Sequence, residues 1–144
     1  MICICTAEKK SKIFVDSSAW VALFFENDQS HKKAVTLFQK LKALRAPLYT
    51  SDYVIDETIT TLLFKSGHKQ SVAAGKALFF SEIIKIVYVH PDYFKPAWEL
   101  YQKYADKKFS FTDVTSFVIA KDIHIKKVFS FDGDFSKAGF ELIS

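Results

Sequence analysis

Short apolar runs alternate with longer amphipathic stretches along most of the chain. The runs are rich in β-branched and aromatic residues, which is typical of buried strands. They cover residues 12–16, 48–50, 85–90, 126–131 and 140–143. The stretches between them carry apolar residues three and four positions apart, a spacing that predicts amphipathic helices. These helices are expected over residues 17–27, 31–45, 51–67, 70–83, 92–106 and 112–123.

Several predicted helices carry recognisable start and stop signals. Ser51 or Asp52 is placed to cap the helix that Gly67 ends, and Pro47 follows the end of the helix over residues 31–45. Pro96 is expected in the first turn of its helix, where proline is tolerated. The apolar stripes of two helices consist of Ala34, Phe38, Leu41 and Leu44 in the first, and of Tyr93, Ala97, Tyr101 and Tyr104 in the second.

Strands that alternate with helices predict an α/β protein with helices on both faces of the sheet. We expect a three-layer α/β/α arrangement whose central sheet has four to five strands and is mostly parallel. The length of 144 residues fits one domain with a substantial core. In sheets of this kind, ligands bind beyond the carboxyl ends of the strands. The residues that follow each predicted strand are therefore the first place to look for a site.

The charge balance is mildly basic and agrees with a polyanionic partner without requiring one. The chain has 20 basic and 16 acidic residues, for a formal charge of +4, and is 49% hydrophobic. Only one of the basic residues, Arg45, is arginine. Lysine attracts phosphate as a point charge, whereas bidentate reading of guanine usually uses arginine. If the partner is a nucleic acid, we expect contacts to its backbone more than to its bases.

Cysteine use and hydropathy favour a cytoplasmic protein. Cys3 and Cys5 are the two cysteines, and two residues apart they are poorly placed to form a disulfide with each other. A reducing compartment is the simplest interpretation. The N-terminal stretch lacks an apolar segment long enough for a signal peptide, and no run of about 20 apolar residues predicts a membrane span.

Carboxylates follow or interrupt apolar segments at several points of the chain. Asp16 follows the first predicted strand, Glu57 interrupts a largely apolar helix, Asp113 opens a helix, and Asp132 and Asp134 follow another strand. Taken one at a time, each has an ordinary explanation as a helix cap, a turn residue or a solvent-facing side chain. For Asp134, beside Gly133, we keep turn formation as the leading interpretation.

Taken together, these acids favour a metal site. Carboxylates that converge at one sheet edge repel one another unless a cation lies among them. A set of oxygen ligands without cysteine or histidine suits Mg²⁺ or Mn²⁺. The four histidines lie far apart in the sequence without ligand spacing, so we regard them as incidental to the site; they are His31, His68, His90 and His124.

The strings "FVDSSAWVALF", "FSFTDVTSFVIAK" and "VFSFDGDF", together with the isolated Glu57, resemble the PIN-domain family, and most closely its VapC-type toxins. Each motif is short, and the specificity comes from their order and from the elements that carry them. The resemblance covers the chain from residue 12 onward. It implies that residues 12–144 form a single PIN-like domain, preceded by an N-terminal extension, residues 1–11, outside the usual pattern.

The resemblance also implies a site and an activity. The four acids of the family fall on Asp16, Glu57, Asp113 and Asp132, which would hold Mg²⁺ or Mn²⁺ and hydrolyse RNA to leave 5′-phosphate and 3′-hydroxyl ends. Supporting roles are implied for Ser18, Thr112 and, as an outer or substitute ligand, Asp134. The implied partners are an RNA substrate, an antitoxin protein and a second copy of the chain in a homodimer.

Surface features could serve such partners. The pairs Phe24–Phe25 and Phe79–Phe80 offer apolar surface, although one residue of each pair is expected in the core. Lysines near the helices of the site could guide RNA, and a solvated surface is the alternative for each. These lysines are Lys65, Lys69, Lys107, Lys108, Lys121, Lys126 and Lys127.

Other functions fit the residues less well. A non-catalytic PIN-like module that binds RNA or protein is the main alternative, and a missing acid would favour it. A haloacid-dehalogenase-type phosphotransferase would carry Asp or Thr where Ser18 stands. A response-regulator receiver would need an acidic pair before Asp16, and the sequence there is "KKSKIFV". A flap-cutting DNA nuclease usually carries further DNA-binding elements, for which this chain has no room.

Overall fold

The structure, a computed structural model, describes residues 10–143 and contains a five-stranded sheet in which every neighbouring pair is parallel. The strand order is β3-β2-β1-β4-β5. Ile13 is the register partner of Leu48 on one side and of Lys127 on the other. The predicted sheet is confirmed, and the strands are β1 (Ile13–Val15), β2 (Leu48–Ser51), β3 (Ile84–Val87), β4 (Lys127–Phe129) and β5 (Glu141–Leu142).

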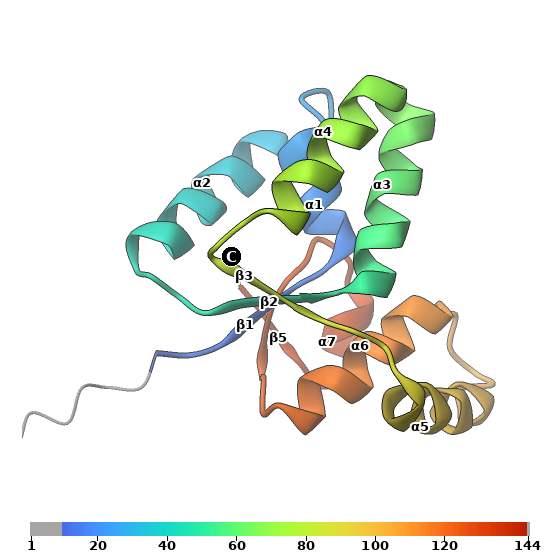
Figure 1. Cartoon of the computed structure of the whole chain (residues 1–144). Coiled ribbons are helices and arrows are strands. Elements are labelled where there is room, and N and C mark those ends of the chain that lie inside the picture. Colours follow the sequence, from blue (N-terminus) through green and yellow to red (C-terminus); the bar gives the residue numbers. More distant parts are fainter. Residues whose placement is uncertain (1–9, 144) are drawn as a thin grey trace, which may run out of the picture.

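Helices cover both faces of the sheet, as Figure 1 shows. The crossovers from β1 to β2 and from β2 to β3 lie on one face: α1 (Ser17–Phe24), α2 (His31–Ala43), α3 (Asp52–Ser66) and α4 (His68–Phe79). The return from β3 to β4 lies on the other: α5 (Pro91–Lys103) and α6 (Phe111–Asp122). The short α7 (Asp134–Lys137) connects β4 to β5. The predicted three-layer α/β/α arrangement is confirmed.

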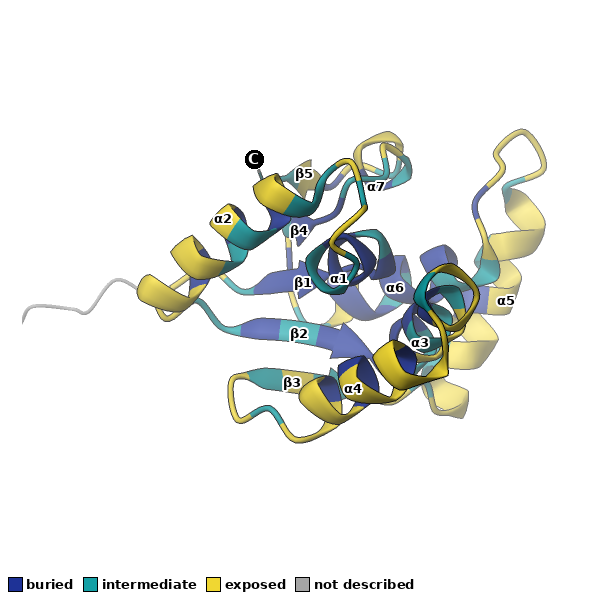
Figure 2. Ribbon diagram, turned by 90° about the horizontal axis from the view of Figure 1, so that it is seen from above, coloured by how far each residue is buried: buried dark blue, intermediate teal, exposed yellow. Residues whose placement is uncertain are grey.

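The core lies on both sides of the central strands (Figure 2). All three residues of β1 are buried, as expected for a parallel strand that has helices on both faces. Trp20 of α1 is 1% exposed, and its indole N–H donates to Thr50 Oγ1 at 3.2 Å. Thr50 in turn donates to the carbonyl oxygen of Val15 at 2.9 Å, which ties α1 and β2 to the end of β1.

Helix boundaries follow the predicted caps with a few corrections. Ser51 is the N-cap of α3, and Gly67 ends that helix with a φ of 93°, a left-handed value that favours glycine. Pro96 is in the second turn of α5, because His90 and Pro91 begin the helix earlier than predicted. The short helix α7 was not predicted, because its four residues are too few to show a hydrophobic period.

The predicted apolar surfaces also need correction. Leu44 and Tyr101 were expected in apolar stripes, but they are 57% and 40% exposed. Phe79 and Phe80 are both exposed, so the expectation that one of them lies in the core is wrong. Phe24 and Phe25 are half-buried, against the small cluster of Val21, Leu62 and Ala74.

Two predictions concern the chain as a whole. Among the helices of residues 10–143, none has both the length and the apolar character needed to cross a membrane. The division into an extension and a single domain stays a prediction, since most of the extension, including Cys3 and Cys5, lies outside the described residues.

The sheet has a topological switch point between β1 and β4. From β1 the chain adds β2 and β3 toward one edge of the sheet, and from β4 it adds β5 toward the other edge. A crevice forms at such a switch point beyond the carboxyl ends of the strands. Asp16 follows β1 and Ser130 follows β4, and the backbone N–H of Asp16 donates to the carbonyl oxygen of Phe129 at 3.0 Å. The fold therefore brings two of the predicted motifs to this crevice.

Candidate active site

Asp16 lies at the bottom of the site and is 2% exposed. It is the N-cap of α1, and its Oδ2 accepts hydrogen bonds from the hydroxyls of Ser18 and Ser130, each at 3.0 Å. Burial raises the pKa of its carboxyl group, and repulsion from Glu57 adds to this shift, although the hydrogen bonds oppose it. Among the described residues, no group hydrogen-bonds to Asp16 Oδ1, although this atom is buried.

A web of short polar contacts joins the loop after β4 to the start of α1. The hydroxyls of Ser18 and Ser130 lie 3.0 Å apart, and Ser18 Oγ also accepts the backbone N–H of Phe131 at 3.0 Å. Ser130 Oγ accepts the backbone N–H of Asp132 at 3.0 Å. The same hydroxyls that hold Asp16 thus also fix the chain that carries Asp132.

Glu57 reaches the site from α3. Its Oε1 accepts a short hydrogen bond from the hydroxyl of Ser17, the first residue of α1. Its neighbour Asp56 is exposed. Burial is the main cause of the raised pKa values of Asp16 and Asp113, and repulsion from Glu57 adds to both shifts.

Asp113 is 6% exposed and lies in the first turn of α6. A capping box orients it: the Ser110 backbone N–H donates to Asp113 Oδ2 at 3.2 Å, and the Asp113 N–H donates to Ser110 Oγ at 3.0 Å. Burial, with repulsion from Asp16, Asp132 and Glu57, raises the pKa of Asp113 to about 7. Near neutral pH this carboxyl group therefore readily gains or loses a proton.

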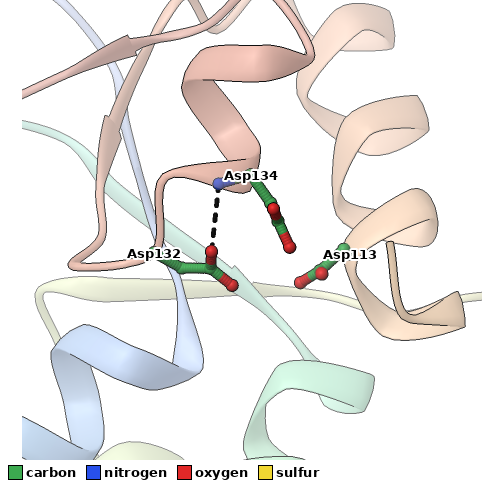
Figure 3. Close-up of side chains that lie close together, drawn as sticks. All are labelled: Asp113, Asp132 and Asp134. Carbon is green, nitrogen blue, oxygen red and sulfur yellow. Dashed lines mark hydrogen bonds between the residues drawn. The ribbon is translucent and has the colours of Figure 1, made fainter. Parts of the chain in front are cut away.

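Asp132 and Asp134 complete the acidic cluster, and Figure 3 shows both side chains directed toward Asp113. One carboxylate oxygen from each of the three residues lies within 4.8 Å of the others. The backbone N–H of Asp134 donates to Asp132 Oδ1 at 3.0 Å. The hydrogen bond closes a turn around Gly133, as expected from the sequence, and Asp134 then begins α7 with its carboxylate close to those of Asp113 and Asp132.

The arrangement fits a divalent cation. The donors are all carboxylate oxygens, the type that Mg²⁺ and Mn²⁺ prefer. Asp16 Oδ1 is buried without a hydrogen-bond partner among the described residues, and the pKa values of Asp16 and Asp113 are raised. Both features indicate negative charge that a bound cation would offset. The cluster identified by distance contains Asp113, Asp132 and Asp134, while Asp16 and Glu57 line the adjoining part of the site through the serine contacts.

The supporting residues agree only partly with the sequence prediction. Ser18 contacts Asp16 as expected. The carbonyl oxygen of Thr112 accepts hydrogen bonds from the hydroxyls of Thr115 and Ser116. The hydroxyl that contacts Asp113 belongs to Ser110 instead. We did not single out Ser17, Ser110 or Ser130 from the sequence. Only Ser110 had a usable signal, since a serine three residues before an acid at a helix start indicates a capping box.

The predicted lysines do not all lie near the site. Lys127 begins β4, whereas the acids follow the end of that strand, and Lys121 lies in the last turn of α6, away from Asp113. Lys121 and Lys126 line a separate surface hollow together with His124. Of the other predicted lysines, Lys65 lines a hollow that also contains Ser17 and Ser18.

Comparison with known proteins gives consistent results. A family model described as PIN domain matches residues 13–141. The 23S rRNA-specific endonuclease VapC20 of Mycobacterium tuberculosis is 38% identical over 129 residues, which are 89% of this chain and 95% of the relative. The VapC ribonuclease of Archaeoglobus fulgidus is 24% identical over 124 residues, 85% of this chain and 78% of the relative.

Solved structures share the fold. The crystal structure of VapC20 from Mycobacterium tuberculosis, described as a sarcin-ricin loop cleaving toxin, matches with a TM-score of 0.81 and 37% identity, over 90% of this chain and 96% of that one. FitAcB from Neisseria gonorrhoeae matches with a TM-score of 0.63 and 16% identity, over 92% and 96% of the two chains. At this lower identity the likeness concerns the fold alone.

Proposed function

The chain belongs to the PIN-domain family, and from this premise we propose that it is a metal-dependent ribonuclease, the toxin of a toxin–antitoxin pair. Membership confirms the resemblance inferred from the sequence motifs. The 38% identical relative is an rRNA-specific endonuclease, and the alignment with it covers 89% of this chain. No acid predicted for the site is missing. A non-catalytic module would not need to keep all of them.

The observation that carries the proposal is the convergence of carboxylates from separate elements at one switch point of the sheet. Asp113 is buried and its pKa is raised to about 7. A buried carboxylate oxygen of Asp16 has no hydrogen-bond partner among residues 10–143. Keeping such groups together is unfavourable for a protein that binds nothing there. A bound cation would account for both features.

We assign the cation to Mg²⁺ or Mn²⁺, held by Asp16, Glu57, Asp113 and Asp132, with Asp134 as a further ligand or an outer partner. When bound, such a cation lowers the pKa of water and offsets the charge of a scissile phosphate. The chain's own residues would position these oxygens: Ser18 and Ser130 orient Asp16, and Ser110 orients Asp113. Asp113 would have to release its proton before it could contribute a full charge to the cation.

The substrate would be RNA, and 23S ribosomal RNA is the first to test because VapC20 is specific for it. The partner would be an antitoxin protein that silences the site, since the 37% identical VapC20 structure is described as a toxin. Both proposals place the chain in the cytoplasm, where ribosomes are found.

We also propose that two copies of the chain associate. Phe94, Trp98 and Tyr101 of α5 are 42%, 50% and 40% exposed, and they pack around Phe111 next to the site. Exposed aromatic side chains that lie together are typical of protein contacts. Sedimentation of the wild type and of a Trp98→Ala variant would test this part, and we expect a dimer that the variant weakens.

The decisive experiment is cleavage of an RNA that contains the sarcin-ricin loop, with Mg²⁺ or with EDTA. We expect metal-dependent cutting that leaves 3′-hydroxyl ends and that tolerates a 2′-deoxy sugar at the cut nucleotide, since the proposed hydrolysis does not use the 2′-hydroxyl. A contaminating metal-free ribonuclease would fail on the deoxy substrate. Absence of cutting by folded, antitoxin-free protein on this RNA and on a mixed RNA pool would favour a binding module.

A further inference from the structure

A small hollow lies beside the acidic site, between α1 and α3. It has a volume of about 240 Å³. Ser17 and Ser18, which hydrogen-bond to Glu57 and Asp16, form part of its wall. We refer to it as the α1–α3 hollow; its lining includes Ser17, Ser18, Gln29, Thr61, Lys65 and Phe131. The hollow therefore shares two residues with the site and continues it along α3.

The wall that α3 contributes changes from negative to positive away from the acids. Glu57, Thr61 and Lys65 are spaced four residues apart and so lie on one face of the helix. Glu57 belongs to the acidic site, while Thr61 and Lys65 line the hollow. An acid, a hydroxyl and an amine thus succeed one another along the same side of the helix.

Lys65 is available to a ligand. Its side chain is exposed, and it is absent from the ion pairs within 4.0 Å among residues 10–143. Its Nζ lies 5.9 Å from the centre of the Phe25 ring, a contact that restrains the side chain without neutralising it. The hollow also contains Asp28, but Asp28 Oδ1 accepts the backbone N–H of Ser30 at 2.8 Å, which keeps it engaged in the loop before α2.

An RNA strand that enters an acidic site brings one negative charge with each nucleotide. A cation among the carboxylates can offset the charge of the scissile phosphate, but the neighbouring phosphates would still meet the acids. An amine and a hydroxyl next to the site are suitable ligands for one such phosphate. Charge complementarity therefore favours a phosphate in the α1–α3 hollow.

We infer that the α1–α3 hollow binds a backbone phosphate of the RNA next to the scissile one, with Lys65 as its cation and Thr61 as a hydroxyl donor. This inference rests on the proposed ribonuclease function and adds a substrate-binding residue to it. Lys65 would act on binding of the strand and on its register, and would leave the chemical step unchanged.

The test compares Lys65→Gln with Lys65→Arg and with the control Lys76→Gln, which removes the same charge from an exposed position of the neighbouring helix α4. In cleavage of a short RNA, we expect Lys65→Gln to raise KM about 10-fold and to change kcat less than about 3-fold. The slope of log KM against log salt should fall by about 0.7, the value for one lost phosphate contact on a single strand. Lys65→Arg and Lys76→Gln should stay near wild type.

A second arm locates the phosphate. A neutral methylphosphonate placed at single linkages beside the cut should weaken wild-type cleavage about 10-fold at one linkage. It should have no further effect there in Lys65→Gln, because the contact is already lost. A full effect of that methylphosphonate in Lys65→Gln would overturn the inference, as would equal KM values for Lys65→Gln and Lys76→Gln.

The arms also separate this inference from the proposed function. Fluorescence anisotropy with labelled RNA in EDTA measures binding without turnover, so equal Kd values for the two glutamine variants would overturn the inference even if no RNA were cut. A Lys65→Gln variant that cuts RNA normally but escapes inhibition by its co-expressed antitoxin would assign the hollow to a protein carboxylate, and would likewise overturn it.

Discussion

The two sides of the acidic site are held in place in different ways. On the side of β1 and β4, Asp16 receives the hydroxyls of Ser18 and Ser130, residues 112 positions apart in the sequence. On the side of α6, Asp113 is oriented by Ser110, three residues before it, within a single helix start. The first carboxylate is held partly by a residue from a distant segment, Ser130 after β4, and the second by a local cap.

This difference has an energetic counterpart. Hydrogen bonds to Asp16 oppose the effect of burial on its pKa, while Asp113 has the Ser110 backbone N–H as the contact that lowers its pKa. Asp113 therefore remains close to its titration point near neutral pH. We conclude that the β1–β4 side holds its carboxylate with side-chain hydrogen bonds, and that the α6 side carries a carboxyl group whose charge near neutral pH depends on a bound cation.

The largest expected effect comes from removing either carboxylate. Asp16→Asn and Asp113→Asn should each lower the rate of RNA cleavage by more than about 100-fold, because a ligand matters more than the outer partners, for which 10–100-fold is typical. Initial rates under saturating Mg²⁺ would measure this. Asp56→Asn, which removes an exposed charge one residue from Glu57, is the matched control, and activity near wild type in Asp113→Asn would refute its place in the site.

The hydrogen bonds from Ser18 and Ser130 to Asp16 should have the second-largest effect. Substituting both Ser18 and Ser130 by alanine leaves the buried Asp16 Oδ2 without its hydroxyl donors, so we expect a loss of about 1–3 kcal/mol in the free energy of unfolding. Activity should fall about 10–100-fold. Urea denaturation and cleavage rates would measure the two effects, and a stable but inactive double variant would show that the web positions Asp16 without supporting the fold.

The local cap on the other side should matter less. Ser110→Ala removes one capping hydrogen bond of α6, which is worth about 1 kcal/mol, and should lower activity by less than about 10-fold. Ser30→Ala is a suitable control for stability, because Ser30 precedes α2 without making a side-chain cap bond. If Ser110→Ala proved as damaging as the double variant, the two sides would not differ as described.

The smallest effect concerns pH. The pKa of Asp113 is raised from 3.8 to about 7, so the folded state holds a proton that the unfolded chain has released. The stability of the cation-free protein should therefore fall as pH rises from about 4 to 7. In Asp113→Asn this decrease of stability with pH should disappear. The variant should then be more stable than the wild type at pH 8 by on the order of 1 kcal/mol, which corresponds to a rise in Tm of about 2–6 °C. Thermal melts in EDTA at several pH values would measure it, and an unchanged slope would contradict the assignment.

The comparison also shows what the sequence can predict. The alternation of strands and helices was sufficient for the layers and the parallel sheet. The apolar pattern drew attention to the acids, and the resemblance to the PIN-domain family singled out Asp16, Glu57, Asp113 and Asp132 among them. The contacts of Ser130 could not be predicted, because they depend on β4 lying beside β1, a pairing between distant segments. The inward direction of Asp134 depends on α7, which is too short to leave a periodic pattern.

The most direct test of the central claim, that carboxylates from both sides of the site hold one divalent centre, is calorimetric titration of Mn²⁺ at pH 8. We predict that the wild type binds Mn²⁺ and that Asp16→Asn and Asp113→Asn each weaken binding at least about 10-fold, while Asp56→Asn does not. Wild-type affinity in both site variants, or the absence of Mn²⁺ binding in the wild type, would contradict the account.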